Sequence, residues 1–143
     1  MRNIRFSLLA ITMVLCACAP GGSSQPTHMV QETLKNEAAR NHTFLADMYA
    51  DAYFPDQVVD HGKAILVRLC HRIEEQHPAD LDALYSLTHS ATNEFNDLQA
   101  EFEANDSELE TGARESIGMD FAFIAEAYGY KADVEELIAT REW

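Results

Sequence analysis

Few residues in this chain have the types and spacing that a reactive site requires. Glu74 and His77 form one Glu-x-x-His pair, whereas a helical di-iron centre needs two such pairs and two further carboxylates. Because His77 precedes Pro78 at the expected end of a helix, we expect this pair to be solvated. Glycine-rich phosphate loops, a Ser-His-Asp order and zinc-type Cys and His spacing are missing from the sequence. The sequence therefore predicts no catalytic residue, no metal site and no cofactor.

Asp120 is the carboxylate in the least comfortable position. At about 100° per residue it falls within the apolar arc of the helix expected over residues 107–128. An isolated buried carboxylate is prohibitively costly, so Asp120 must be paired or protonated. The candidate partners are a tyrosine hydroxyl, Arg68, Arg72 or His61. We favour a structural ion pair or hydrogen bond over a functional acid or ligand.

Two histidines allow a second interpretation. His61 flanks Gly62 at the margin of a buried helix face, where it could line a cleft or be a solvated rim residue. His89 belongs to a neutral polar stripe that suits either a neighbouring helix edge or a partner, and we favour the first. The alternative to an interaction protein is therefore an enzyme or small-ligand binder with a pocket near His61, His89 and Asp120.

Three aromatic residues gather where the first expected helix ends. Tyr49, Asp51, Tyr53 and Phe54 lie directly before Pro55. If these rings are exposed, they form an anchor patch of the kind that interfaces use. We favour the other arrangement, in which they cap the bundle, because Pro55 turns the chain back onto its own core.

The elements that must position these residues are helices. Apolar residues recur at helical spacing, and no segment alternates with period two for long enough to be a strand. We expect four helices and a short fifth one that starts after its cap, Asp133, and the four span about residues 30–53, 56–76, 80–104 and 107–128. Asn41 interrupts the first apolar arc, so a break near residues 41–43 is an alternative.

Local signals mark three points of this architecture. Ser107 and Glu110 have the spacing of a capping box that opens the fourth helix. Gly129 supplies the left-handed residue that ends it. Gly62 stands in the middle of a buried face, which indicates close approach of a neighbouring helix or ring. Since the links are short, neighbouring helices should be antiparallel, and we expect an all-α, up-down four-helix bundle-like domain.

The charge of the chain excludes one class of partner. The 143 residues contain 24 acidic and 10 basic side chains, a net charge of −14. Two of the ten basic residues are Arg2 and Arg5, so the remainder of the chain carries eight against 24 acids, a net charge of −16. Nucleic-acid backbones would be repelled. A protein partner should present a basic surface.

The first residues look like an export signal. Arg2 and Arg5 precede the apolar run Phe6–Leu15, which is about half the length needed to span a bilayer. The sequence Leu15-Cys16-Ala17-Cys18 resembles a bacterial lipobox in which Cys18 is the modified residue. The resemblance implies a diacylglyceryl thioether on Cys18 and an acylated α-amine, which together would anchor the chain in a membrane.

This interpretation divides the chain into three parts. Residues 1–17 form the signal peptide, residues 18–28 the lipidated Cys18 and a flexible tether, and residues 29–143 one helical domain. Ala19 after the cysteine implies the outer membrane, with the domain facing the periplasm. Cys70 would be the only other cysteine of the mature chain, and we expect it in the core. The alternatives are a soluble exported protein and a chain that starts at Met29.

Several segments together resemble a known family. They are Phe44–Pro55, Leu87–Thr92, Asp120–Phe121, Ala127–Tyr130 and Glu136–Trp143. The family consists of small bacterial proteins catalogued as a domain of unknown function, and the likeness covers about residues 42–143. It implies no activity, ligand or catalytic residue. The leader and tether depart from the family's usual pattern, which puts in doubt any role inferred from a cytoplasmic setting.

The sequence thus favours a lipid-anchored, non-enzymatic interaction protein of the cell envelope. Its role would be that of an inhibitor or immunity-type factor. The contact surface would combine the acidic residues with the Tyr49–Phe54 region, and the partner would be a basic envelope protein.

Overall fold

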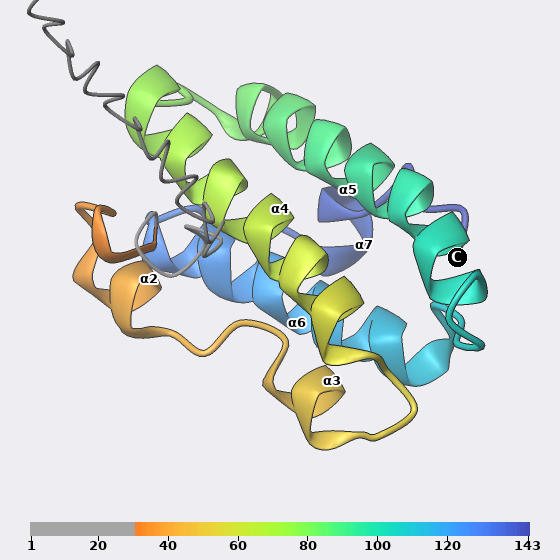
Figure 1. Cartoon of the computed structure of the whole chain (residues 1–143). Coiled ribbons are helices and arrows are strands. Elements are labelled where there is room, and N and C mark those ends of the chain that lie inside the picture. The colour runs from red at the N-terminus through yellow and green to blue at the C-terminus, as the bar shows by residue number, and fades with distance from the viewer. Residues whose placement is uncertain (1–30) are drawn as a thin grey trace, which may run out of the picture.

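The computed structural model describes residues 31–143, and in this part of the chain every regular element is a helix (Figure 1). Three long helices carry the architecture, namely α4 (Asp56–Gln76), α5 (Leu81–Glu103) and α6 (Thr111–Ala127). The short helices α2 (Glu37–Asn41), α3 (Ala46–Ala50) and α7 (Val134–Leu137) accompany them. The predicted all-α, bundle-like fold class is confirmed. The predicted signal peptide, Cys18 and the tether lie outside the described residues.

The helices α4 and α5 lie where the sequence predicts them. Pro55 is the N-cap of α4, and the left-handed His77 directly before Pro78 closes the other end. Asp80 caps α5 by accepting a 2.9 Å hydrogen bond from the backbone N–H of Ala83. The two helices run antiparallel and share the most extensive helix–helix contact of the described residues (Figure 1). Within residues 31–143, no helix combines the length and the apolar character needed to cross a membrane.

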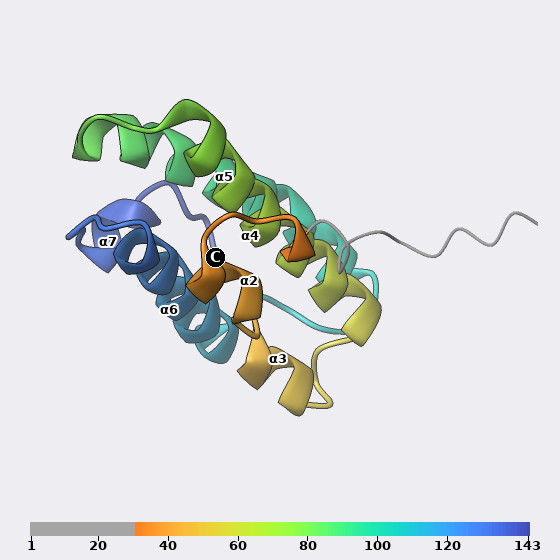
Figure 2. The ribbon, with the colours of Figure 1, turned by 90° about the vertical axis from the view of Figure 1, so that its left-hand side faces the viewer.

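The first expected helix, over residues 30–53, is not continuous. The chain leaves helical conformation between Asn41 and Ala46, near the predicted alternative break. His42 is extended, and Leu45 is left-handed with a φ of 55°. The resulting short helices α2 and α3 both pack against α6, whose other flank is covered by α7 (Figure 2). Two short helices therefore occupy the position that a fourth long helix would fill.

The predicted capping box at Ser107 is wrong. α6 begins at Thr111 with Glu110 as N-cap, and no side chain caps it. The backbone N–H of Ser107 instead donates to the carbonyl of Phe102 at 3.0 Å, a bond that closes the end of α5. Ser107 is buried, and its hydroxyl has no hydrogen-bond partner. Ser107 thus ends one helix and cannot open the next.

The two remaining boundary signals are confirmed. Gly129 is left-handed, with a φ of 86°, directly after the C-cap of α6. The backbone N–H of Tyr130 then donates to the carbonyl of Ala125 at 2.8 Å, which closes the helix end. Asp133 caps α7 through a 2.8 Å hydrogen bond from the backbone N–H of Glu135.

Gly62 lies at the tightest point of the core. A Cβ at this position would come within 3.0 Å of Leu45 Cδ1 and 3.1 Å of Phe95 Cε1. Leu45 and Phe95 are themselves almost completely buried. The predicted close approach of a ring to Gly62 is therefore confirmed, and it joins α4 to both α5 and the start of α3.

We predict that Gly62→Ala destabilises the protein. Overpacking a tight core costs about 1–3 kcal/mol, which outweighs the gain of about 1 kcal/mol that alanine brings to a helix interior. Gly112→Ala is the matched control, because nothing lies within 4 Å of a Cβ added there. Urea denaturation should show a lower midpoint for Gly62→Ala and an equal or higher one for Gly112→Ala. Equal stabilisation by both changes would contradict the packing argument.

Candidate functional site

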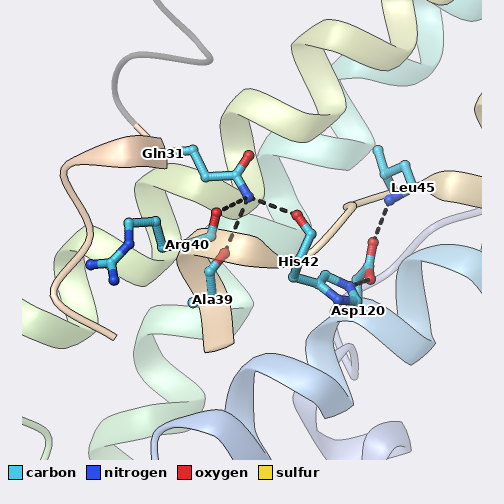
Figure 3. Close-up of polar contacts among 6 residues, drawn as sticks. All are labelled: Gln31, Ala39, Arg40, His42, Leu45 and Asp120. Atoms are coloured by element: carbon cyan, nitrogen blue, oxygen red, sulfur yellow. Dashed lines mark hydrogen bonds and ion pairs between the residues drawn. The ribbon is translucent and has the colours of Figure 1, made fainter. Parts of the chain in front are cut away.

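Asp120 of α6 is buried and fully paired. Only 6% of its surface is exposed. Its Oδ1 lies 2.7 Å from Nε2 of His42, and its Oδ2 accepts a 2.7 Å hydrogen bond from the backbone N–H of Leu45 (Figure 3). The expected pairing of this carboxylate is thus present, but with a different partner.

The candidate partners Arg68, Arg72, His61 and a tyrosine hydroxyl were all wrong for Asp120. Arg68 and Arg72 both pair with Glu94 across the α4–α5 contact. His42 can reach Asp120 because the chain is extended between α2 and α3. His42 was not among the candidate partners. In the expected continuous helix over residues 30–53, it would not have reached Asp120.

The loop that presents His42 is held from its other side by Gln31. The Nε2 of this buried side chain donates to three backbone carbonyls, those of Ala39, Arg40 and His42, at 3.1, 3.3 and 2.8 Å (Figure 3). Carbonyls in the last turn of a helix have no partner within the helix. Gln31 thus supplies the hydrogen bonds that α2 leaves unmade and fixes the backbone of His42.

The electrostatics of the pair follow from burial. Burial raises the pKa of Asp120, and the hydrogen bonds from His42 and from the N–H of Leu45 offset that rise only in part. The imidazole of His42 stacks on Phe123, with ring centroids 3.7 Å apart, and meets Phe44 edge-on. The aromatic rings and Asp120 together hold the imidazole in one orientation.

A histidine paired with a carboxylate can act as a general base when a substrate reaches its second ring nitrogen. Surface pockets of about 360 to 430 Å³ open on the described part of the chain, and their lining residues do not include His42 or Asp120. The geometry therefore fits a structural clasp, in which Asp120 holds the loop between α2 and α3 onto α6.

The structure does not bring His61, His89 and Asp120 together. His61 is exposed, and its Nδ1 lies 2.6 Å from Oε2 of Glu101 on α5. His89 donates from Nε2 to the backbone carbonyl of Glu136 in α7, at 2.7 Å. Each of the three residues thus has a different hydrogen-bond partner, and of the three only His61 lines one of these pockets.

The polar stripe around His89 receives the C-terminal segment. Asn96 donates to the carbonyl of Thr140 at 2.9 Å and accepts from the backbone N–H of Glu142 at 3.0 Å. The hydroxyl of Thr140 in turn donates to the carbonyl of His89. This is the docking of a neighbouring element that the sequence favoured for the stripe.

The aromatic turn between α3 and α4 both caps the core and reaches the surface. Phe54 is buried against Phe102, with ring centroids 6.2 Å apart. Tyr49 is half-buried, and its hydroxyl donates to Asp60 at 2.6 Å. Asp51 accepts from the backbone N–H of Tyr53, which holds the turn. Tyr53 remains 39% exposed, edge-on to Phe54.

Exposed carboxylates gather at the same end of the bundle. The start of α4 lies beside the end of α5, since Gln57 donates to Asn105 (Figure 1). Neither residues 41–62 nor residues 95–113 contain a lysine or arginine. We call this surface the acidic end and define it by its exposed acids, which are Asp51, Asp56, Asp60, Glu101, Glu103, Asp106, Glu108 and Glu110.

A second buried carboxylate was missed. Glu74, expected to be solvated, is only 9% exposed. It accepts hydrogen bonds from the backbone N–H groups of Lys35 and Asn36 and from the hydroxyl of Tyr128. Glu74 follows the buried Cys70 by four residues, a spacing that places both on one helix face. That spacing could have indicated that Glu74 is buried. We expected a solvated residue instead, because the nearby Pro78 marks the end of the helix.

Cys70 is a core residue, as predicted. It is fully buried, and burial raises the pKa of its thiol to about 12. Such a thiol remains protonated at neutral pH and is a poor nucleophile. Within residues 31–143, no group of three or more His, Cys, Asp and Glu side chains is arranged to hold a metal ion.

The fold and the site define a small all-α domain whose buried polar groups hold irregular backbone in place. A family model described as a family of unknown function (DUF5713) matches residues 38–143, and the chain belongs to that family. The resemblance to a domain-of-unknown-function family is thereby confirmed. No curated protein and no solved structure matches the chain.

We predict that Asp120→Ala costs about 2–4 kcal/mol of stability, because it leaves a buried N–H and an imidazole without their partner. Asp120→Asn should cost less, since the amide can still accept from Leu45 and donate to His42. Asp47→Ala, which removes an exposed acid from α3, is the control and should change stability little. Thermal and urea unfolding measure all three. Equal effects of Asp120→Ala and Asp47→Ala would refute the clasp.

Proposed function

We propose that this protein is a lipid-anchored, non-enzymatic interaction module of the bacterial cell envelope. Acyl chains on Cys18 hold it in the outer membrane, and the helical domain faces the periplasm. There it binds a basic envelope protein, in the manner of an inhibitor or immunity-type factor.

The acidic end is the observation that carries this proposal. Eight exposed carboxylates lie there, in segments without lysine or arginine. The partly exposed ring of Tyr53 belongs to the same surface. Interfaces commonly combine a tyrosine anchor with charges that steer the partner. A basic partner surface would meet both features at once.

The other polar groups have structural roles, which supports an interaction role over a catalytic one. Asp120 holds a loop, His89 holds the C-terminal segment, and the buried Cys70 thiol is protonated at neutral pH. The alternative of an enzyme or ligand binder at His61, His89 and Asp120 has lost its support, because these residues have separate neighbours.

The anchor is tested by labelling cells with palmitate. Cys18→Ser should abolish the label and release the protein from the membrane fraction, because Cys18 is the proposed site of acylation. Cys16→Ser is the matched control and should leave both the label and the location unchanged. A Cys18→Ser chain that is still labelled would refute the anchor.

The interface is tested by photo-crosslinking in intact cells. A photoreactive residue at position 53 should capture one basic envelope protein, and reversing the charge of Glu103, Asp106 and Glu108 to lysine should abolish the product. Position 81 is the control, since Leu81 is 37% exposed, close to the 39% of Tyr53, and opens α5 at the other end of the bundle. Absence of a product from position 53, or the same product from position 81, would contradict the proposal.

A further inference from the structure

A pocket of about 400 Å³ opens at the end of the bundle opposite to the acidic end. Its lining residues come from the end of α4, from the segment before α2 and from the residues that follow α6. Its walls include Lys35, Glu74, His77, Pro78, Tyr128 and Tyr130. We call it the Glu74 pocket, and neither the acidic end nor the clasp at Asp120 involves it.

Glu74 is the buried charged group of this pocket, which the exposed Lys35 also lines. Its Oε1 accepts hydrogen bonds from the N–H groups of Lys35 and Asn36, both at 2.9 Å, and from the hydroxyl of Tyr128 at 2.7 Å. Its Oε2 accepts one bond, from the N–H of Lys35 at 3.0 Å. Burial opposes ionisation, but these bonds outweigh it and hold the pKa of Glu74 below its usual value. Glu74 is therefore an anion at neutral pH.

This anion lacks a countercharge in direct contact. Among residues 31–143, no lysine, arginine or histidine nitrogen forms an ion pair with Glu74. Lys35 contributes its backbone N–H, and the electrostatic influence of His71 also lowers the pKa of Glu74. The other buried carboxylate, Asp120, has the imidazole of His42 at 2.7 Å. Hydrogen bonds satisfy the oxygen atoms of Glu74 but do not neutralise its charge.

Aromatic rings held in place form part of the wall around this charge. The hydroxyl of Tyr130 donates to the carbonyl of Pro78 at 2.6 Å, and the hydroxyl of Tyr128 donates to Glu74. Both rings are therefore positioned without a ligand. A carboxylate beside tyrosine rings is the combination that stabilises organic cations, through charge and through cation–π attraction. A metal ion would need more ligand atoms than this single carboxylate supplies.

We propose that the Glu74 pocket binds an organic cation, namely an alkylammonium or guanidinium group. The group places its positive charge against Glu74 and its alkyl part against Tyr128, Tyr130 and Ile73, which also lines the pocket. It belongs either to a free small amine or to a lysine or arginine side chain of another protein. The inference does not depend on the proposed function, because the pocket and the acidic end are at opposite ends of the bundle.

The proposal is tested by calorimetric titration of the full chain, purified in detergent, with n-butylammonium, n-butylguanidinium and uncharged n-butanol. At matched ionic strength the two cations should bind at one site and n-butanol should not. Glu74→Gln should weaken cation binding by about tenfold or more, because it removes the facing charge. Glu75→Gln, which removes an exposed acid from the next position of α4, should leave binding unchanged.

Two further variants keep the test valid if Glu74→Gln lowers stability. Tyr130→Leu removes a ring and should weaken binding severalfold, whereas Tyr53→Leu, at the acidic end, should not. Lys35→Gln keeps the backbone N–H that bonds to Glu74 and removes a competing cation, so it should strengthen binding. Binding that is insensitive to Glu74, Tyr130 and Lys35, or that is equal for n-butanol, would overturn the proposal.

Blocked tripeptides with a central lysine or arginine distinguish the two sources of the cation. Tighter binding of the peptides than of n-butylammonium and n-butylguanidinium assigns the pocket to a protein side chain. Binding of the free cations alone assigns it to a small amine. If neither binds, the proposal fails, while photo-crosslinking from position 53 still tests the proposed function separately.

Discussion

The N-terminal part of the described domain depends on buried carboxylates that accept hydrogen bonds from backbone N–H groups. Glu74 of α4 accepts hydrogen bonds from the backbone N–H groups of Lys35 and Asn36. Asp120 of α6 accepts one from the backbone N–H of Leu45. Each of these residues lies just before a short helix or in the turn that leads to it, where the backbone lacks intrahelical partners. An unpaired buried N–H costs about 1–3 kcal/mol. Two long helices thereby stabilise a segment that could not satisfy its own backbone.

The same interactions explain how much of the fold the sequence could predict. The bounds of α4 and α5 were predicted correctly, because local signals such as Pro55 and Pro78 mark them. The first helix was predicted wrongly because a distant contact overrides local preference, and the start of α6 was predicted wrongly because Ser107 closes the preceding helix instead. Asp120 stabilises the left-handed Leu45 across 75 residues of chain, and Ser107 is committed to closing α5. Helical periodicity carries no information about either contact.

The site residues also differ in how much of their environment the local sequence could predict. The sequence identified Asp120 as a paired carboxylate because its helical face alone was sufficient, but the identity of its partner required the extended loop at His42. Glu74 was assigned to the surface because Pro78 suggested a frayed helix end, whereas segment 35–36 folds over it. The net charge could be predicted from the sequence, but the position of the acidic end could not. This surface forms only because the start of α4 lies beside the end of α5.

The pairing of early residues with late ones also governs the order in which the chain can become structured. Leu45 cannot take its left-handed conformation at low cost until Asp120 is present, and the imidazole of His42 has no carboxylate partner until then. Contacts of such high sequence separation form late, after the entropy of closing a long loop has been overcome. On the ribosome, the portion synthesised first therefore stays open until α6 has emerged. The N-terminal part of the described domain therefore completes its packing only after most of the chain has been synthesised.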